Sequence, residues 1–308
     1  MATAKRKVDR EVSRRNASGL ARDLTILEVL AEAETPEGLG VVRVAAALGR
    51  DKATVSRAMS TLADAGILRR DEDSRLYRIG PKIFALAALT AEATLVREAR
   101  PFLRRVARQS RETTHLSVLR GGSVLTLLSE LSPNEIRTRS WEGRASDPLL
   151  TPSGRVLVSE WGDAELAEWY AQQSSTAQPS STPLAMDEEE DEDVDLATPA
   201  PTWFDATEAT LPVYDLARLL QETARIRRLG YATSDEEFEV GVVAASAPVR
   251  DHTDRIVAAL NISAPKARVG SNLDRLGIYV ANAADRLSQQ LGATPRPADA
   301  PGRVRPLA

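Results

Sequence analysis

One stretch of the sequence, GRDKATVSRAMSTLADAGILRRDEDSRLYRIG at residues 49–80, constrains the fold more than any other. Gly49 can take the left-handed conformation that closes a helix, and Asp51 can cap the next helix by accepting hydrogen bonds from its first-turn amides. Gly66 is placed to stop that helix, which predicts a helical segment of about thirteen residues. The remaining GILRRDEDSRLYRIG predicts two short strands around the polar turn DEDS.

Two further helices are predicted before this stretch. Leucines recur at helical spacing over about residues 19–33, at Leu20, Leu24, Leu27 and Leu30. A short helix, VVRVAAALG, then ends at Gly49. Three helices followed by a strand hairpin are typical of a winged helix-turn-helix, in which the hairpin is the wing. We therefore predict a winged helix-turn-helix domain over residues 19–80.

The third helix of this domain has one apolar and one polar face. Val55, Met59 and Leu62 lie three or four positions apart and are expected to pack inward. Short polar and basic side chains are left toward solvent in the amino-terminal half, which is the half that reaches base edges in such domains. An ordinary amphipathic helix, or a winged helix that binds protein, is the simpler alternative.

The pattern nevertheless favours DNA binding. Arg57 can form two hydrogen bonds with a guanine, Arg43 can clamp a phosphate, and Arg75 on the wing can enter the minor groove. The candidate DNA-binding residues are Arg43, Lys52, Thr54, Ser56, Arg57 and Arg75.

Beyond residue 80 the patterns predict a second domain of the α/β (α+β) class with mostly antiparallel strands. A linker helix is expected over residues 81–99 and the second domain over 100–291. The expected strands are the hairpin THLSVLRGGSVLTLLSEL and the segments EIRTRSW, VGVVAASAPV and RIVAALNIS. Expected helices include one from about Pro152 to Glu160 and a final one ending near Leu291.

Three segments lack the pattern of packed elements and are expected to be disordered: residues 1–18, 172–201 and 292–308. The first is basic and can neutralise phosphates without sequence preference. The second, QQSSTAQPSSTPLAMDEEEDEDVDLATPAP, is rich in Ser, Pro and acidic residues. Its acids could compete with DNA for the basic helix or bind a partner, although a solvated loop is the simpler interpretation.

Composition excludes several kinds of site. The 308 residues include no cysteine, so disulfides, thiolate metal sites and a cysteine nucleophile are excluded, and no metal or cofactor is expected. The two histidines lie far apart; His115 is expected to be structural and His252 to lie in a turn. Apolar runs fall short of the ~20 residues that cross a bilayer, and no signal-like segment opens the chain. A cytoplasmic protein without membrane contact is therefore expected.

The order LTILEVL…VVRVAAALGRDKATVSRAMSTLADAGILRRDEDSRLYRIG resembles the DNA-binding domain of the IclR family of bacterial transcriptional regulators. The segments EGRASDPLLTPSGRVLVSE, ARIRRLGYATSDEEFEVGVVAASAPVRD and RIVAALNISAPKARV resemble the GAF-like effector-binding domain of that family. The resemblance covers residues 19–291 apart from the acidic insertion. It implies a homodimer or homotetramer that binds a partly palindromic DNA operator and responds to a small molecule. Most members repress transcription, and the effector is often a small organic acid or an aromatic metabolite.

By position, the resemblance places effector-binding residues at Ser153, Asp235, Ala244, Asn261 and Ser263. The chain departs from the family at three points. Leu150 or Thr151 stands where the family usually has a histidine, Ala264 where a glycine is common, and Ala244 where some members have a cysteine.

Charge suggests one further effector-binding candidate. Arg139 alternates with Arg137 in EIRTRSW, so both could share one face of a strand and clamp a carboxylate of a small organic acid or amino acid. On an edge strand, the two arginines would instead face water.

The sequence thus favours a sequence-specific DNA-binding regulator, which the resemblance implies to be a repressor, whose operator affinity is modulated by a small metabolite. One alternative is a DNA-binding protein of the nucleoid or partner-binding type without an effector. Another is an enzyme built on the second domain, for which Ser153 would need a base that the sequence does not place near it. We therefore predict that the chain is not an enzyme.

Overall fold

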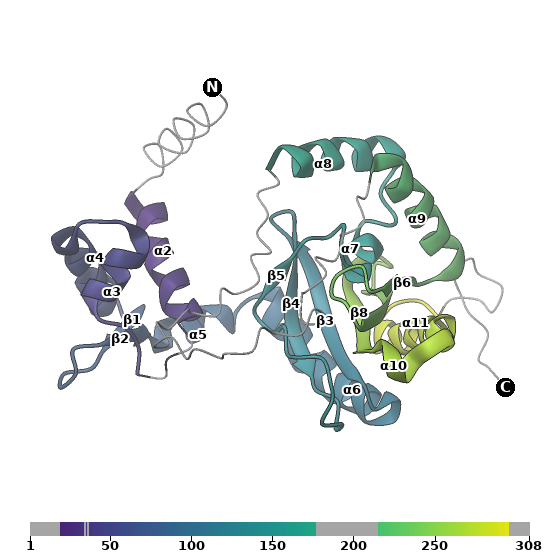
Figure 1. Cartoon of the computed structure of the whole chain (residues 1–308), viewed down its shortest axis with the longest axis horizontal. Coiled ribbons are helices and arrows are strands. Elements are labelled where there is room, and N and C mark those ends of the chain that lie inside the picture. Colours follow the sequence, from purple (N-terminus) through teal and green to yellow (C-terminus); the bar gives the residue numbers. More distant parts are fainter. Residues whose placement is uncertain (1–18, 34, 36, 177–214, 296–308) are drawn as a thin grey trace, which may run out of the picture. The chain divides into compact units, whose positions relative to one another are not determined.

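The computed structural model of the chain describes residues 19–33, 35, 37–176 and 215–295. The chain divides into two compact units, Met1–Thr94 and Leu95–Ala308, whose elements are labelled in Figure 1. The basic segment 1–18, the acidic run at 187–195 and residues 296–308 lie outside the described residues. Predictions about those segments therefore stay predictions.

The first unit is a winged helix-turn-helix. Its elements are α2 (Gly19–Glu32), α3 (Val41–Leu48), α4 (Lys52–Asp64), β1 (Leu68–Arg70), β2 (Tyr77–Ile79) and α5 (Pro81–Ala87). Ile26, Val44, Val55 and Met59 are completely buried where the three helices meet, so the apolar positions of the sequence form one core. The predicted fold of this domain is confirmed.

The turn between α3 and α4 has the predicted geometry. Gly49 closes α3 in the left-handed conformation, at φ 59° and ψ 35°. Arg50, the next residue, donates a hydrogen bond of 2.7 Å to the carbonyl of Arg22 and forms an ion pair of 3.2 Å with Asp23. Both partners lie on α2, so the turn is tied to the first helix as well as to the second.

The wing is a short antiparallel hairpin in which Leu68 pairs with Ile79 and Arg69 with Arg78. Asp71 begins its turn and accepts hydrogen bonds of 2.9 Å from both the backbone N–H and the hydroxyl of Ser74. These bonds satisfy the backbone of the turn locally, as the DEDS composition predicts. They also hold the pKa of Asp71 below its usual value, chiefly through the backbone hydrogen bond from Ser74.

The second unit contains one six-stranded sheet with strand order β5-β4-β3-β8-β7-β6, and each of its pairings is antiparallel. The strands are β3 (Thr113–Arg120), β4 (Ser123–Glu130), β5 (Ala145–Ser146), β6 (Ala232–Asp235), β7 (Val242–Arg250) and β8 (Ile256–Pro265). The helices of this part of the chain are α6 (Ala91–Ser110), α7 (Pro152–Leu157), α8 (Asp163–Thr176), α9 (Leu216–Leu229), α10 (Lys266–Val269), the 3₁₀ turn η2 (Gly270–Asn272) and α11 (Leu273–Gln290). The predicted mixed α/β class is confirmed.

The two faces of this sheet differ in chemistry. On one face Leu116 and Leu260 pack against Leu103 of α6 and Val280 of α11 in the main core. The alternate residues of the same strands point the other way, because successive strand side chains face opposite sides. Those residues are polar: His115 and Ser117 on β3, and Asn261 and Ser263 on β8. The sheet therefore offers a polar surface beside the helices α7 and α9.

Some predicted boundaries differ from the structure. The linker expected at 81–99, as part of one or two helices, contains α5 and the start of α6, which are separated at Ala88–Thr90, and α6 continues into the second unit. Residues 172–176 were expected in the disordered insertion but form the last turns of α8. A helix ends where its backbone pairing ends, and polar composition alone does not mark that point.

The strand expected at EIRTRSW is wrong. Residues 131–144 form an irregular loop between β4 and β5. Side chains hold this loop to the sheet: Thr138 lies 2.7 Å from the Ser263 hydroxyl, and the Ser129 hydroxyl accepts from the backbone N–H of Trp141 at 3.1 Å. A pattern of alternating residues was therefore misread, because the loop is fixed by side-chain bonds and not by a strand ladder.

Candidate functional site

Helix α4 presents the polar face that the sequence predicts. Val55 and Met59 are fully buried, whereas Lys52, Thr54 and Arg57 are exposed and Ser56 is half-buried. The exposed residues occupy the first half of the helix, so their side chains can contact a partner while Val55 and Met59 stay packed in the core. This face is available to a large partner such as a nucleic acid groove.

The start of α4 is fixed by Asp51. Its carboxylate accepts a hydrogen bond of 2.9 Å from the backbone N–H of Thr54 and one of 3.1 Å from the Thr54 hydroxyl. The first of these bonds is the main cause of a lowered pKa for Asp51. Because the Thr54 hydroxyl donates its proton to Asp51, this side chain can offer DNA only its methyl group and its hydroxyl lone pairs.

Arg43 and Arg75 are also exposed. Arg75 has a left-handed backbone with φ 59°, which turns the chain back toward β2 at the tip of the wing. Arg69 and Arg78 stand opposite each other on the wing, and Arg78 lies 3.5 Å from Asp71. The wing therefore has more basic side chains than the sequence analysis singled out.

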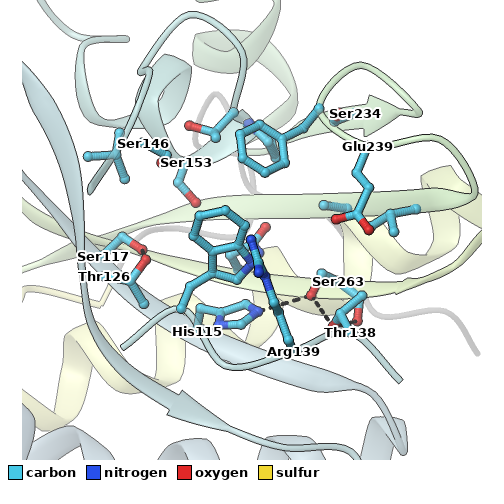
Figure 2. Close-up of a pocket in the computed structure, with 18 of the residues that line it drawn as sticks. His115, Ser117, Thr126, Thr138, Arg139, Ser146, Ser153, Ser234, Glu239 and Ser263 are labelled. Carbon is cyan, nitrogen blue, oxygen red and sulfur yellow. Dashed lines mark hydrogen bonds between the residues drawn. The ribbon is translucent and has the colours of Figure 1, made fainter. Parts of the chain in front are cut away.

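The second unit contains a cavity of about 390 Å³ on the polar side of the sheet, shown in Figure 2. Side chains from β3, β4, β5, β6, β7, β8 and α7 line it, together with the loops at 131–144 and 236–241. A volume of this size suits a small organic molecule. Five of the six predicted effector-binding residues line this cavity: Arg139, Ser153, Ala244, Asn261 and Ser263.

The sixth, Asp235, does not line the cavity. Its carboxylate forms an ion pair of 2.9 Å with Lys266, and its side chain is half exposed. Ser234, the preceding residue of β6, is buried and lines the cavity instead. Since side chains alternate along a strand, a register difference of one residue exchanges the inward and outward positions.

His115 lies at the base of the cavity as drawn in Figure 2 and is 4% exposed. Its Nδ1 is 2.9 Å from the Ser129 hydroxyl and its Nε2 is 3.0 Å from the Ser263 hydroxyl. Burial lowers the pKa of His115 to about 4, so the ring is neutral at pH 7. The predicted structural role fits this bonding, but the sequence analysis missed that His115 also lines the cavity.

Aromatic and charged side chains surround the more open part of the cavity. The Arg139 guanidinium lies 4.5 Å from the centre of the Trp141 ring, and Trp141 meets the Phe238 ring edge to face at 5.2 Å. A cation over an aromatic face is attracted by the ring quadrupole, which holds Arg139 in place. Arg137 and Glu239 are exposed and line the same region.

Helix α7 supplies the opposite wall. Thr151 caps it by accepting a hydrogen bond of 3.2 Å from the backbone N–H of Gly154. A Cβ atom at Gly154 would come within 2.2 Å of the carbonyl oxygen of Pro148, so only glycine fits here. This close approach holds α7 against the preceding loop and points Ser153 into the cavity (Figure 2).

Arg155 is a residue that sequence reasoning missed. It is completely buried and donates hydrogen bonds of 2.6 Å to Glu237 and 2.8 Å to the carbonyl of Thr233. Glu237 belongs to the loop that also contains Phe238 and Glu239, so Arg155 fixes one wall of the cavity. An arginine inside the otherwise apolar and small-residue run TPSGRVLV was the available signal.

Across 19–33, 35, 37–176 and 215–295, no group of three or more His, Asp or Glu side chains is placed to bind a metal ion. No helix in those same segments is long and apolar enough to cross a membrane.

A winged helix with an exposed polar face, in one chain with a domain that encloses a cavity for a small molecule, defines a DNA-binding transcription regulator. Comparison with known families agrees. The model described as IclR helix-turn-helix domain matches residues 19–72, and the model described as Bacterial transcriptional regulator IclR C-terminal matches residues 87–189 and 182–289. The chain belongs to the IclR family of bacterial transcriptional regulators. Its members are regulators and not enzymes, as the sequence predicted.

Similar curated proteins include the HTH-type transcriptional regulator KdgR of Escherichia coli, which is 27% identical over 90% of this chain and 94% of the relative. BhcR of Paracoccus denitrificans is also 27% identical, over 90% of this chain and 88% of the relative. Among solved structures, an IclR transcriptional regulator from Silicibacter sp. TM1040 is similar with a TM-score of 0.63 and 25% identity, covering 91% of this chain and 98% of that one. An IclR homologue from Microbacterium hydrocarbonoxydans, complexed with 4-hydroxybenzoate, shares the fold with a TM-score of 0.67 and 20% identity, over 89% and 99% of the two chains.

Proposed function

We propose that this chain is a sequence-specific repressor whose affinity for a partly palindromic operator is changed by a small organic acid or amino acid bound in the second unit. The observation that supports it best is the combination of an exposed reading face on α4 with a cavity lined by Arg139 and several hydroxyl groups. The domain limits that we propose are 19–80 for DNA binding, 81–99 for the linker and 100–291 for effector binding. A cytoplasmic location accompanies this function.

On α4, Arg57 is the proposed base-reading residue, because a guanidinium can form two hydrogen bonds with guanine. Lys52 and Ser56 of the same helix are proposed for phosphate or base contacts, and the methyl group of Thr54 for contact with a thymine methyl. Arg43 and Arg75 are proposed as contacts to the DNA backbone and the minor groove. The arginines of the wing, Arg69 and Arg78, add positive charge beside them.

A small acid is supported as the effector by the guanidinium groups at the open part of the cavity, since arginine binds carboxylates through paired hydrogen bonds. The structural neighbour from Microbacterium hydrocarbonoxydans holds 4-hydroxybenzoate, which is such an acid. An effector acts on DNA affinity only through its different affinities for the two states of the protein.

Repression is supported by AllR of Escherichia coli, which is named a transcriptional repressor and is 26% identical over 93% of this chain. A homodimer or homotetramer is supported by helix α5 and the turn after it, where Phe84 is 79% exposed and Leu89 is 84% exposed. Large apolar side chains at this exposure are typical of a surface that another chain covers. A palindromic operator would match the twofold symmetry of such an assembly.

Footprinting on the DNA upstream of the chain's own gene tests the proposal. We expect a bounded protected site, and we expect Arg57→Ala to reduce the preference for this site over scrambled DNA by about 1 to 3 kcal/mol at fixed salt. Arg275→Ala, which removes an exposed arginine from α11, is the matched control and should leave the preference unchanged. An unbounded footprint, or a preference that Arg57→Ala does not alter, would contradict sequence-specific reading.

A further inference from the structure

A second cavity lies on the other side of the sheet, between two helices. Its volume is about 320 Å³, and all of its lining residues belong to α6 and α11. These helices pack on the apolar face of the sheet, whereas the cavity described above lies on the polar face. They run side by side in opposite directions, since Gln290 donates to the carbonyl of Glu98 at 3.1 Å and Tyr279 donates to Gln109 at 3.3 Å. The second cavity is therefore a separate site.

Two guanidinium groups line this second cavity. They belong to Arg105 on α6 and Arg286 on α11, and both side chains are exposed. Within the residues that the structure describes, neither forms an ion pair, although Arg100 and Arg104 of the same helix α6 both pair with Glu130. The described residues that line the cavity include no aspartate or glutamate. Two positive charges therefore share one cavity, and no lining residue balances them.

Aromatic side chains of the cavity interact with both cations. The Arg105 guanidinium lies 5.5 Å from the centre of the Phe102 ring, whose quadrupole attracts it. Burial raises the pKa of the Tyr279 hydroxyl, while the positive charge of Arg286 acts in the opposite direction. Tyr279 is therefore protonated at pH 7 and donates its proton to the side-chain carbonyl of Gln109. The N–H groups of the Gln109 amide remain able to donate to a ligand.

The inner wall of the second cavity is apolar. Phe102, Val106 and Ala283 line it and are buried in the main core. A ligand with an apolar body would remove the remaining apolar surface of this wall from water, which is favourable. The volume lies near the lower end of the range for small-molecule sites, about 300 to 1,000 Å³. The cavity therefore suits a small molecule that combines an apolar body with negative charge.

A second copy of the chain fits this cavity less well. An isologous contact centred here would place Arg105 and Arg286 of one copy against the same two residues of the other. Guanidinium groups would then face one another with no acid among the lining residues, and like charges at an interface are unfavourable. Charge therefore favours a small anion over a second copy as the occupant.

We propose that the second cavity binds a small dianion with an apolar body, either a dicarboxylate or a phosphate monoester, with its negative groups on Arg105 and Arg286 and its body on Phe102 and Val106. Guanidinium groups bind carboxylate and phosphate oxygens through paired hydrogen bonds. Gln109 adds a further donor. This site is additional to the effector cavity on the polar face, and its ligand class does not depend on the effector that binds there.

Isothermal titration calorimetry on the full chain tests the inference with three probes that share one ring: isophthalate, phenyl phosphate and benzoate. At a pH of about 8 the first two carry two negative charges and benzoate carries one. We expect at least one dianion to bind about tenfold or more tightly than benzoate, because its second charge gains a guanidinium partner. The tighter of the two dianions identifies the source of the charge as paired carboxylates or as a phosphate. Its affinity should fall as salt is added.

Arg105→Gln and Arg286→Gln should each weaken binding of the tighter dianion by about tenfold or more. Arg108→Gln on α6 and Arg275→Gln on α11 are the matched controls, since both remove exposed arginines that do not line the second cavity. They should leave the affinity unchanged. Arg139→Gln removes a guanidinium from the cavity on the polar face, and the dianion should still bind this variant.

Several results would overturn the inference: no binding of either dianion, equal affinities for the dianions and benzoate, binding that Arg139→Gln abolishes, or a loss that the control variants share. An affinity that Arg105→Gln or Arg286→Gln leaves unchanged would also overturn it. A thermal melt of each variant shows that it is folded. Footprinting of the unmodified chain is an independent measurement, so the proposed DNA-binding function stands or fails separately.

Discussion

At the scale of single residues, His115 links the stability of the second unit to pH. Its pKa of about 4 in the folded chain lies below the ordinary value of 6.5, because burial disfavours the charged ring. Between these two pH values the unfolded chain binds a proton that the folded chain does not. The free energy of unfolding therefore falls as the pH is lowered through this window and is fully recovered above it.

Replacing this histidine should remove that dependence. As the pH drops from 6.5 toward 4, we expect the free energy of unfolding of the unmodified chain to fall. His115 contributes up to about 1.4 kcal/mol per pH unit to this slope. His115→Gln should flatten the curve, whereas His252→Gln, at an exposed position, should not. Urea unfolding at several pH values measures both. Parallel curves for the unmodified chain and His115→Gln would show that the ring does not titrate in this way.

Gly154 gives a second prediction, on the stability of the second unit. Because a Cβ atom there would lie 2.2 Å from the carbonyl oxygen of Pro148, Gly154→Ala must displace α7 or the loop before it. We expect a loss of about 1 to 3 kcal/mol in the free energy of unfolding. Gly162→Ala is the control, since a Cβ atom at that position meets nothing within 4 Å. Equal stability of the two variants in chemical denaturation would show that α7 and the loop before it can shift without loss of stability.

At the scale of elements, the sequence pattern predicted most of the helices and hairpins whose ends are fixed by interactions between residues close in the chain. The helices α2, α3 and α4, the wing, the β3–β4 hairpin and α11 were all expected within a few residues of their observed limits. Each has its own signal in the chain, such as the cap at Asp51 or the turn-forming pair Gly121 and Gly122, which both have positive φ. The sequence pattern is sufficient where the partner group lies within a few residues.

The features that were missed depend on distant partners. The segment EIRTRSW within the loop at 131–144 was expected to be a strand, but its Thr138 is bonded to Ser263, which lies 125 positions away in the sequence. Asp235 was predicted by its position in the family resemblance, and nothing local in the sequence reveals that Ser234 is the residue of β6 that points inward. The buried Arg155 pairs with Glu237, 82 positions away. Such contacts form only in the assembled sheet, so the local sequence does not predict them.

The pair of Arg155 and Glu237 gives a prediction for the loop at 236–241. Glu237→Gln removes the carboxylate charge that is paired with the completely buried guanidinium of Arg155. We expect this change to lower the free energy of unfolding by about 3 kcal/mol or more. Glu239→Gln, in the same loop but exposed, should have little effect on stability. Thermal unfolding of both variants is the measurement. Similar melting temperatures would show that the ion pair does not hold the loop.

At the scale of the whole molecule, two separate cores imply two separate unfolding events. Met59 is fully buried in the core of the first unit and Leu260 in that of the second. We expect calorimetry to resolve two transitions, of which Met59→Ala lowers one and Leu260→Ala the other, each by about 2 to 5 kcal/mol. One transition that both substitutions lower equally would show instead that the units unfold together.

The strand order has a consequence for the chain while it is being made. His115 on β3 meets Ser263 on β8, 148 positions later, at the centre of the sheet, whereas the first unit closes its core within residues 1–94. A ribosome that adds 5 to 20 residues per second needs roughly 10 to 30 s to travel from the end of the first unit to the end of β8. During that interval the α4 face can already be folded, but the cavity of the second unit cannot exist, because β8 is not yet made. In a newly synthesised copy the surface of the first unit therefore forms before the cavity of the second.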